Sequence, residues 1–265
     1  MNKRVPLFGF ELDAVDMKQA VARIYSWIAE GKKDCRFVVT PNVDHSVIYQ
    51  EHAGLRQAYA NASLVLADGA PVVAAARLLG RPVPCRVAGS DLAPAIFEAA
   101  EQRGGLRVYL LGAGPGVAER AASNIVRRWP AVQVVSTYSP PLGFEHDPRE
   151  NAFILAQIAA AQPDILMVGL GAPKQELWVN AHREQIESSA ALCIGATIDF
   201  LAGEKRRAPR WMRRTGLEWV HRVASEPRRL LRRYARDARV FPCLVGRECL
   251  VALRSRIAQI HSSSG

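Results

Sequence analysis

Short apolar runs rich in β-branched residues alternate with segments of helical spacing along the chain before residue 203. The runs are RFVVT (36–40), SLVLAD (63–68), RVYLLGA (107–113), VQVVST (132–137), ILMVGLG (165–171) and ALCIGA (191–196). Between them, segments such as MKQAVARIYSWIAE and GVAERAASNIVRRW repeat apolar residues three and four positions apart, which is typical of a helix with one buried face. This alternation predicts an α/β fold with a mostly parallel sheet covered by helices on both faces.

Length and composition set the class of protein. With 265 residues, 49% of them apolar, the chain is long enough to bury a large core, which excludes disorder of the whole. Its five cysteines are scattered, with no C-x-x-C pair, and indicate neither a disulfide framework nor a zinc site, so a reducing cytosolic setting is predicted. Glu11 and Asp13 interrupt the first apolar run, and no run approaches the roughly 18 apolar residues of a membrane span. We therefore expect no signal peptide and no crossing of a bilayer.

Positive charge is concentrated near the C-terminus. Between Gly203 and Arg239 thirteen Lys and Arg stand against four Asp and Glu, which accounts for nine of the ten net positive charges. The sequence therefore predicts an α/β catalytic domain over residues 1–202 and a basic helical appendage over residues 203–265. Such clustering indicates a polyanionic partner, either nucleic acid, an anionic membrane surface or phosphates.

Polar residues follow the first two strands of the predicted sheet. In Rossmann-like sheets of this kind, ligands bind at the carboxyl ends of the strands. Pro41 holds Thr40 extended and leaves Thr40, Asn42 and Asp44 near that edge, either to bind a sugar or base or to form a turn with a helix cap. Asp68 ends the second run, where its carboxylate either accepts a proton from a bound hydroxyl or caps the next helix.

Two further segments suit anions. In RVAGSD, Arg86 is placed to meet an anion, and we expect Asp91 to cap the following helix. Gly112, Gly114 and Gly116 form a glycine-rich turn between a strand and a helix, which suits phosphate or nucleotide binding. The spacing is G-x-G-x-G, not G-x-G-x-x-G, and the next strand ends without an acidic residue, so an NAD-dependent oxidoreductase is disfavoured.

The segment VGLGAPKQELWV follows the fifth run. Gly169 and Gly171 allow close approach, and Lys174, Gln175 and Glu176 lie where a helix N-terminus meets the sheet. A capped helix with solvated charges explains Lys174 and Glu176, whereas Gln175 fits better as a residue that contacts a ligand.

These segments together resemble one family. The chain carries, in order, TPN-x-D, ADG-x-P, R-x-x-G-x-D, LGA-x-PG, VGLG-x-PKQE-x-W, G-x-x-x-DF-x-AG-x-x-x-RAP-x-W-x-x-x-x-GLEW and EP-R-x-x-RRY. The series, from about Thr40 to Tyr234, resembles the WecG/TagA/CpsF glycosyltransferases. The resemblance implies an inverting transferase, independent of metals and cofactors, that moves a hexosyl unit from a UDP-sugar to a sugar linked through diphosphate to a polyprenol. The absence of a D-x-D motif agrees with it.

The resemblance also implies roles for single residues. It favours Asp68 as the general base. The positions that it matches to substrate contacts are Thr40, Asn42, Arg86, Gly112, Gly114, Gly171 and Gln175. Those that it matches to the acceptor diphosphate are Arg222, Arg229 and Arg232. The chain departs from the family's more glycine-rich pattern at Ala70, Pro71 and the segment CIGATIDF. These departures leave the details of the sugar pocket open, but they do not change the expected class of reaction.

The segment EPRRLLRRYARDARVF predicts an amphipathic basic helix. One face is expected to carry Arg229, Arg232, Arg233 and Arg236, and the opposite face Leu230, Leu231, Tyr234, Ala238 and Phe241. Trp211 and Trp219 precede it and suit a membrane interface. We therefore expect a cytoplasmic protein held peripherally on the inner face of the cell membrane, with anionic lipid as a partner.

Two other interpretations of the appendage are open. In the first, it forms a helical hairpin that packs on the main domain and leaves its charges solvated. In the second, it binds along the phosphates of a nucleic acid. The second reading leaves the PKQE and ADG motifs unused, so we expect no nucleic-acid partner. The sequence leaves open the transferred sugar, the polysaccharide pathway and the oligomeric state, with a homo-oligomer among the alternatives.

Overall fold

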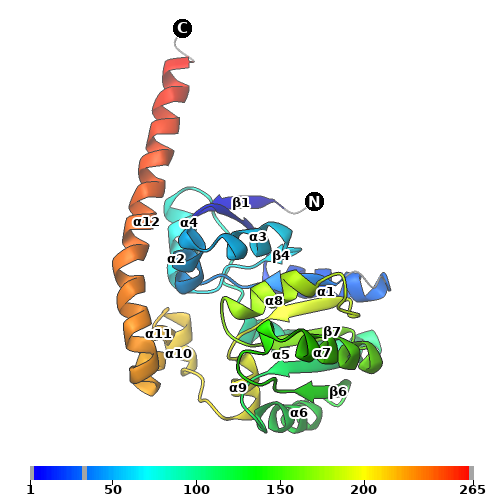
Figure 1. Cartoon of the computed structure of the whole chain (residues 1–265). Coiled ribbons are helices and arrows are strands. Elements are labelled where there is room, and N and C mark those ends of the chain that lie inside the picture. Colours follow the sequence, from blue (N-terminus) through cyan, green and yellow to red (C-terminus); the bar gives the residue numbers. More distant parts are fainter. Residues whose placement is uncertain (1–2, 32–34, 263–265) are drawn as a thin grey trace.

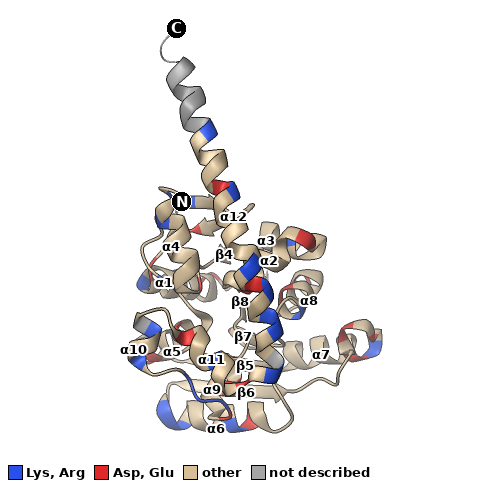
Figure 2. Ribbon diagram, turned by 90° about the vertical axis from the view of Figure 1, so that its left-hand side faces the viewer, with Lys and Arg blue, Asp and Glu red and all other residues tan. Residues whose placement is uncertain are grey.

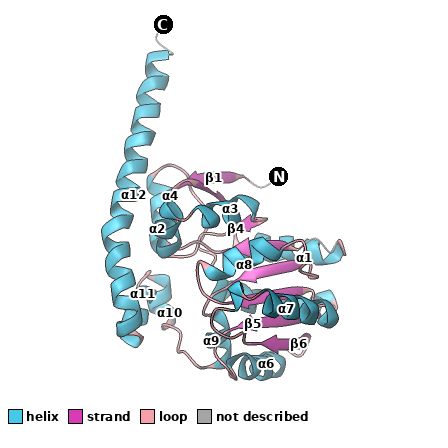
Figure 3. Cartoon of the chain, viewed as in Figure 1, coloured by secondary structure: helices cyan, strands magenta, loops and turns pink. Residues whose placement is uncertain are grey.

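A six-stranded parallel sheet forms the centre of the computed structural model, which describes residues 3–31 and 35–262 apart from the side chains of Arg214, Arg229 and residues 255–262 (Figures 1 and 3). The strand order is β4-β3-β8-β7-β5-β6, and every neighbouring pair is parallel. The strands are β3 (Arg36–Val39), β4 (Leu64–Val65), β5 (Leu106–Gly112), β6 (Val132–Tyr138), β7 (Ile165–Gly169) and β8 (Ala190–Cys193).

Helices cover both faces of this sheet and bury a separate apolar cluster on each. One face carries α3 (Ala53–Asn61), α4 (Ala70–Leu78), α7 (Pro148–Ala161) and α8 (Lys174–His182). The other carries α1 (Met17–Ala29), α5 (Gly89–Ala100), α6 (Val117–Arg128) and α9 (Thr197–Ala202). Two short 3-10 helices, Glu101–Arg103 and Phe144–His146, lie in connections.

Successive strand residues point to opposite clusters. In β3, Phe37 and Val39 belong to one cluster and Val38 to the other, and Leu110 and Leu111 of β5 divide in the same way. Because both faces are buried, the strands other than the edge strand β6 are nearly continuous apolar runs. The predicted α/β architecture is thereby confirmed.

An N-terminal hairpin was not predicted. Strands β1 (Arg4–Leu7) and β2 (Phe10–Asp13) pair antiparallel. The buried Asp13 fixes the hairpin to the sheet, because its Oδ2 accepts a hydrogen bond from the Val65 backbone N–H at 2.9 Å and its Oδ1 lies 3.4 Å from Arg4 Nε. Their sequences, RVPL and FELD, contain charged residues and a proline and lack a continuous apolar run, so the pattern did not predict them.

The C-terminal segment forms three helices, α10 (Arg210–Arg214), α11 (Glu218–Ser225) and the 36-residue α12 (Pro227–Ser262). Helix α12 packs against α11 and against α2 (Val43–Glu51), and its far end projects beyond the body of the molecule (Figures 1 and 2). No described helix is both long and apolar enough to span a membrane.

The two predicted faces of α12 are only partly correct. Leu230 is 3% exposed, but Leu231 on the same predicted face is 61% exposed. Arg233 and Arg236, expected on the outer face, turn inward to Asp44 of α2, with nitrogen–oxygen distances of 3.5 and 2.7 Å. The buried carboxylate draws the arginines toward the body, because a buried charge requires a partner.

Candidate active site

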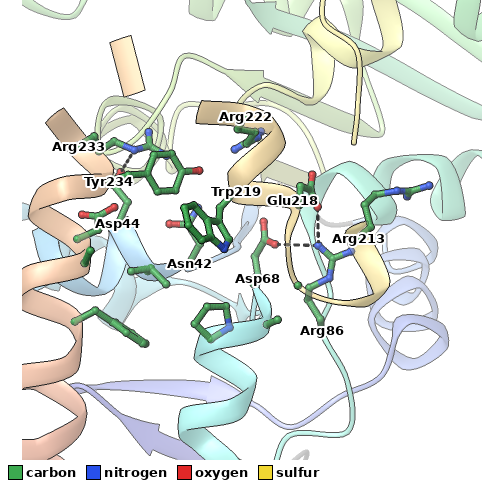
Figure 4. A pocket seen from close by; sticks show the side chains of 18 of the residues that line it. Asn42, Asp44, Asp68, Arg86, Arg213, Glu218, Trp219, Arg222, Arg233 and Tyr234 are labelled. Atoms are coloured by element: carbon green, nitrogen blue, oxygen red, sulfur yellow. Dashed lines mark hydrogen bonds and ion pairs between the residues drawn. The ribbon is translucent and has the colours of Figure 1, made fainter. Parts of the chain in front are cut away.

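Two adjoining pockets lie beside the carboxyl ends of the strands. The first, of about 420 Å³, lies between α2, α4, α11 and α12 and is called the Asp68 pocket (Figure 4). The second, of about 450 Å³, contains Gly171 and Gly195, which follow β7 and β8, and is called the Gly171 pocket. Both pockets are lined by Asn42, Asp44, Arg222 and Arg233. A substrate in one pocket would therefore meet a substrate in the other.

Asp68 lines the pocket named after it, between β4 and α4. Its backbone N–H donates to Pro41 O at 2.9 Å, and none of the described side chains caps α4, so the capping interpretation is wrong. A quarter of its side-chain surface stays open to the pocket. Burial of the rest raises the pKa of the Asp68 carboxyl to about 6, against the opposing charge of Arg86. A carboxylate of this pKa is ionised at neutral pH and still accepts a proton readily.

Arg86 lies among carboxylates. Its Nη1 is 3.8 Å from Asp68 Oδ1 and 3.2 Å from Glu218 Oε2, and its Nη2 is 2.7 Å from Asp91 Oδ2 (Figure 4). Glu218 comes from the appendage, so this arginine joins the catalytic domain to α11. Arg86 lines the Asp68 pocket, but its positive charge is shared among three carboxylates of the protein.

Asp91 does not cap α5. The carboxylate instead accepts from Arg86, from Arg207 at 2.7 Å and from Arg213 at 3.2 Å. These three arginines hold the pKa of Asp91 below its usual value despite burial. The expectation of a cap failed because two of the arginines reach Asp91 from the appendage, more than a hundred residues away along the chain.

Gly216 allows the appendage to approach the catalytic domain closely. It has a φ of +78°, and a Cβ there would lie 2.7 Å from Ala70 Cβ at the start of α4. Any side chain would push the turn between α10 and α11 away from Asp68. The glycine therefore places Glu218 and Trp219 in the Asp68 pocket.

Apolar side chains of α11 and α12 form part of the Asp68 pocket wall, beside Arg233 and Asp237. Trp219 and Tyr234 lie with their rings 6.1 Å apart, and Phe241 and Pro242 extend the lining along α12. Trp219 is thus part of the pocket, whereas Trp211 is exposed and lies outside the described lining. Sequence reasoning assigned Trp219 to the membrane interface; the GLEW motif was the signal for a site role.

Asn42 lines both pockets and also caps α2. Its Oδ1 accepts from the His45 backbone N–H at 3.2 Å. The two interpretations of this residue, cap and pocket residue, are therefore compatible. Thr40 is buried, and its hydroxyl donates to Cys193 O at 3.4 Å. It lies outside the described lining of either pocket.

The glycines have different positions. Gly171 lines the Gly171 pocket, whereas Gly112 and Gly114 lie outside the described lining of both pockets. Gly112 has a φ of +110°, and a Cβ there would lie 2.6 Å from Gly169 O, so it lets β5 and β7 pass closely. Ser139 Oγ donates to the carbonyls of Gly112 and Gly114 at 3.2 Å.

The PKQE segment faces the interior. Gln175 is buried, accepts from Gly195 N–H at 3.0 Å and donates to Glu176 Oε1 at 2.7 Å. Glu176 has no exposed surface, so its interpretation as a solvated charge is wrong. Lys174 pairs with Glu145 at 2.6 Å. The structure thus surrounds Gln175 with protein groups and places it outside the described lining of the two pockets.

Of the three arginines matched to the acceptor diphosphate, one is in the site. Arg222 lines both pockets, with its guanidinium 5.5 Å from the centre of the Phe200 ring. Arg232 is exposed and outside the described lining, and the side chain of Arg229 lies outside the described residues. Arg233, one position from Arg232, lines both pockets instead.

Besides Asp68, a carboxyl with a raised pKa lies on α12. Asp237 lines the Asp68 pocket, and burial together with the charge of Asp44 raises its pKa to about 6. Arg236 Nη2 lies 3.4 Å from its Oδ1. Asp44, Arg233, Arg236 and Asp237 thus form a charged cluster that fixes α12 to α2. Among the described residues, no group of three or more His, Cys, Asp or Glu is arranged to hold a metal ion.

Most of the chain matches one known family. The sequence model described as "Glycosyl transferase WecG/TagA/CpsF family" matches residues 5–255. The chain belongs to this family. The resemblance drawn from the motifs is therefore confirmed, and the protein is a glycosyl transferase.

Among characterised relatives, this glycosyl transferase is similar to two N-acetylglucosaminyldiphosphoundecaprenol N-acetyl-beta-D-mannosaminyltransferases, from Staphylococcus aureus strains MW2 and NCTC 8325. Each is 29% identical over 227 residues, which cover 86% of this chain and 87% of the relative. The family model, over residues 5–255, includes both the part of the chain that forms the sheet and most of the C-terminal helices.

Proposed function

We propose that this glycosyl transferase moves a hexosyl unit, with inversion, from a UDP-sugar to a sugar linked through diphosphate to a polyprenol, in the synthesis of a cell-surface polysaccharide. The observation that carries the proposal is the Asp68 carboxyl, with its raised pKa, in a pocket that shares a wall with a second pocket at the strand ends. The relatives act on a diphosphoundecaprenol acceptor, as their names state.

The Gly171 pocket suits the donor. It lies beyond β7 and β8, at the edge of the sheet where nucleotides bind in open α/β folds. Gly171 and Gly195 leave room for close approach of a ligand, and Lys205, Arg206 and Arg222 add positive charge. A UDP-sugar, with two phosphates and a flat base, matches that lining.

The Asp68 pocket suits the acceptor. Arg213, Arg222 and Arg233 line it and attract a diphosphate, while Tyr234 and Phe241 offer apolar surface to the first isoprene units. The acceptor sugar then lies against Asp68. In the reaction, Asp68 takes the proton of the acceptor hydroxyl. The hydroxyl oxygen bonds to the anomeric carbon of the donor sugar, and the bond between that carbon and UDP breaks.

Charge that develops on the leaving UDP also needs a partner. Arg222 and Arg233 line both pockets, so each lies beside both the proposed donor site and the proposed acceptor site. Preorganised cations beside a leaving group stabilise the transition state more than the ground state. Both arginines come from the appendage, which therefore belongs to the proposed site.

The proposal is tested by incubating the protein with a panel of UDP-sugars, UDP-N-acetylmannosamine among them, and a polyprenyl-diphosphate-linked N-acetylglucosamine. We expect a product heavier by one hexosyl unit for at least one donor, together with release of UDP. The absence of transfer with every donor, in protein that binds UDP, would reject the reaction.

We expect activity to fall on the acid side with an apparent pKa of about 6, because Asp68 must be deprotonated to accept a proton. Below that pH, kcat/KM should fall about tenfold per pH unit. The charged groups that act on Asp68 are Arg86, Glu218, Arg222 and His45. Removing a positive neighbour by Arg86→Gln should move the acid limb to higher pH, and removing a negative one by Glu218→Gln should move it to lower pH.

Arg81→Gln is the matched control for these pH profiles. Arg81 pairs with Glu248 at 2.6 Å, away from the described lining of both pockets. Its acid limb should coincide with that of the wild type. Movement of both site variants in the same direction would show that Asp68 is not the group titrated.

We further propose that the protein lies on the inner face of the cell membrane. Leu250, Val251 and Leu253 are exposed near the described end of α12, as are Arg247 and Arg254. Most of the other cations of α12 lie in its first half (Figure 2). Near an anionic membrane surface, each Lys or Arg contributes about 1 kcal/mol to the free energy of membrane binding.

The protein should therefore sediment with phosphatidylglycerol vesicles at low salt and be released at about 1 M salt, where charges are screened within about 3 Å. Leu250→Ser with Leu253→Ser should weaken this binding, while a short-chain soluble acceptor is still used. Equal binding to neutral phosphatidylcholine vesicles would contradict the electrostatic part of the proposal.

A further inference from the structure

A chain of buried hydrogen bonds connects the two pockets beneath their shared wall. His45 Nδ1 lies 3.0 Å from Asn42 Oδ1, and His45 Nε2 lies 3.2 Å from Glu176 Oε1. Gln175 Nε2 donates to the same Glu176 oxygen at 2.7 Å, and Gly195 N–H donates to Gln175 Oε1 at 3.0 Å. Asn42 at one end lines both pockets, and His45 and Gly195 both line the Gly171 pocket.

Backbone N–H groups at the two ends fix the direction of every bond between them. A backbone N–H can only donate, so the Asn42 atom facing His45 N and the Gln175 atom facing Gly195 N must both be oxygens. The amide group of Gln175 therefore donates to Glu176. The orientations of both amides follow from this chain, without any assumption about a ligand.

The imidazole of His45 lies between two acceptors, Asn42 Oδ1 and Glu176 Oε1, so both of its nitrogens must carry protons to satisfy them. Burial disfavours the imidazolium. The hydrogen bond that His45 donates to Glu176 and the negative charges of Glu176, Asp44 and Asp68 outweigh burial and raise the pKa of His45. Glu176 thus favours the doubly protonated form of His45, in which both ring nitrogens donate.

We propose that His45 and Glu176 are positioning residues for the Asn42 amide. They hold Asn42 Oδ1 turned inward and Nδ2 turned toward the junction of the two pockets. There Nδ2 donates a hydrogen bond to an oxygen of the sugar being transferred. This inference rests on the proposed function. It gives the buried part of the PKQE motif a role without substrate contact, since Gln175 and Glu176 act through Asn42 and Gly195.

The charge on Glu176 is essential to this arrangement. With a neutral side chain of the same shape at position 176, the imidazole loses its counter-charge and keeps one proton. Either the bond to position 176 or the bond to Asn42 is then lost. In the second case a nitrogen lone pair faces Asn42 Oδ1, which the His45 backbone N–H still holds, and the repulsion displaces the amide.

The experiment is a double-mutant cycle of Glu176→Gln and Asn42→Ala, with kcat and KM measured for the best donor. Glu176→Gln alone should lower kcat/KM about five- to tenfold, the size expected for the loss of one hydrogen bond between neutral groups. In the Asn42→Ala background, the same change should cost less than about twofold, because the group that it positions is already absent. Asn42→Asp, which replaces the donor with an acceptor, should be worse than Asn42→Ala.

An equal loss from Glu176→Gln in both backgrounds would overturn the inference and leave the pair with a purely structural role. Should Glu176→Gln fail to fold, His45→Gln in the same two backgrounds makes the test, because glutamine can donate to Glu176 but lacks the ring nitrogen that faces Asn42. Failure of the proposed function is distinguishable, because the wild-type protein would then transfer no sugar, whereas this inference fails in an active enzyme.

Discussion

Replacing Asp68 with asparagine should lower kcat by roughly two to four orders of magnitude, the contribution typical of a positioned general base. The amide keeps the shape of the carboxyl but cannot take the hydroxyl proton. Binding of the UDP-sugar should be largely retained, because Asp68 lies in the proposed acceptor pocket and outside the described lining of the Gly171 pocket. Single-turnover transfer and UDP-sugar titration measure the two effects separately.

Asp237→Asn is the matched control for this variant. Asp237 lines the same pocket and has the same raised pKa of about 6, but it pairs with Arg236 on α12. We expect its loss to change kcat less than tenfold. Near-normal turnover of folded Asp68→Asn protein would remove Asp68 as the base, and a large loss for Asp237→Asn alone would transfer that role to α12.

Removal of the appendage from residue 203 onward should abolish activity on a short-chain, water-soluble acceptor as well as on the lipid acceptor. Loss of membrane binding alone would leave the soluble acceptor as good a substrate as before. The appendage, however, provides Trp219, Arg222, Arg233 and Tyr234 to the pockets, so its removal opens the proposed acceptor site to water. We expect at least a roughly thousandfold loss, since several charged contacts of about 1.5–3 kcal/mol each disappear.

Point variants test the same idea without exposing the surface that α12 covers, which includes Phe8, whose ring lies 5.2 Å from that of Phe241. Arg222→Ala should lower kcat/KM on the soluble acceptor roughly ten- to a hundredfold. Arg232→Ala is the matched control, because Arg232 belongs to the same appendage but is exposed. Full activity of the truncated protein on the soluble acceptor would reduce the appendage to a membrane tether.

A nucleic-acid partner is not proposed, for a reason visible in the contacts. Arg207 and Arg213 pair with Asp91, and Arg233 and Arg236 pair with Asp44. These two carboxylates therefore offset part of the positive charge counted along the appendage and hold four of its arginines against the protein.

The sequence by itself determined the architecture and the class of enzyme. Apolar runs buried on both faces, separated by helical segments, specify a parallel sheet, and all six predicted strands are present. Ligands bind at the strand ends of such sheets, and this placed Asn42, Asp68 and Gly171 near the site before any contact was known. The series of motifs, in a fixed order along the chain, identified the family, because each motif is a short local pattern that is visible without the structure.

Only the tertiary structure decided which polar groups face substrate and which face one another. Glu176 and Gln175 read as helix-start residues but are buried, because His45, 131 positions from Glu176 along the chain, supplies a partner. Asp91 lost its expected role to arginines of the appendage, and Arg233 rather than Arg232 turned inward. Periodicity reports burial within one element, whereas the pairing of charges depends on which elements meet, and that is set by the packing of the whole chain.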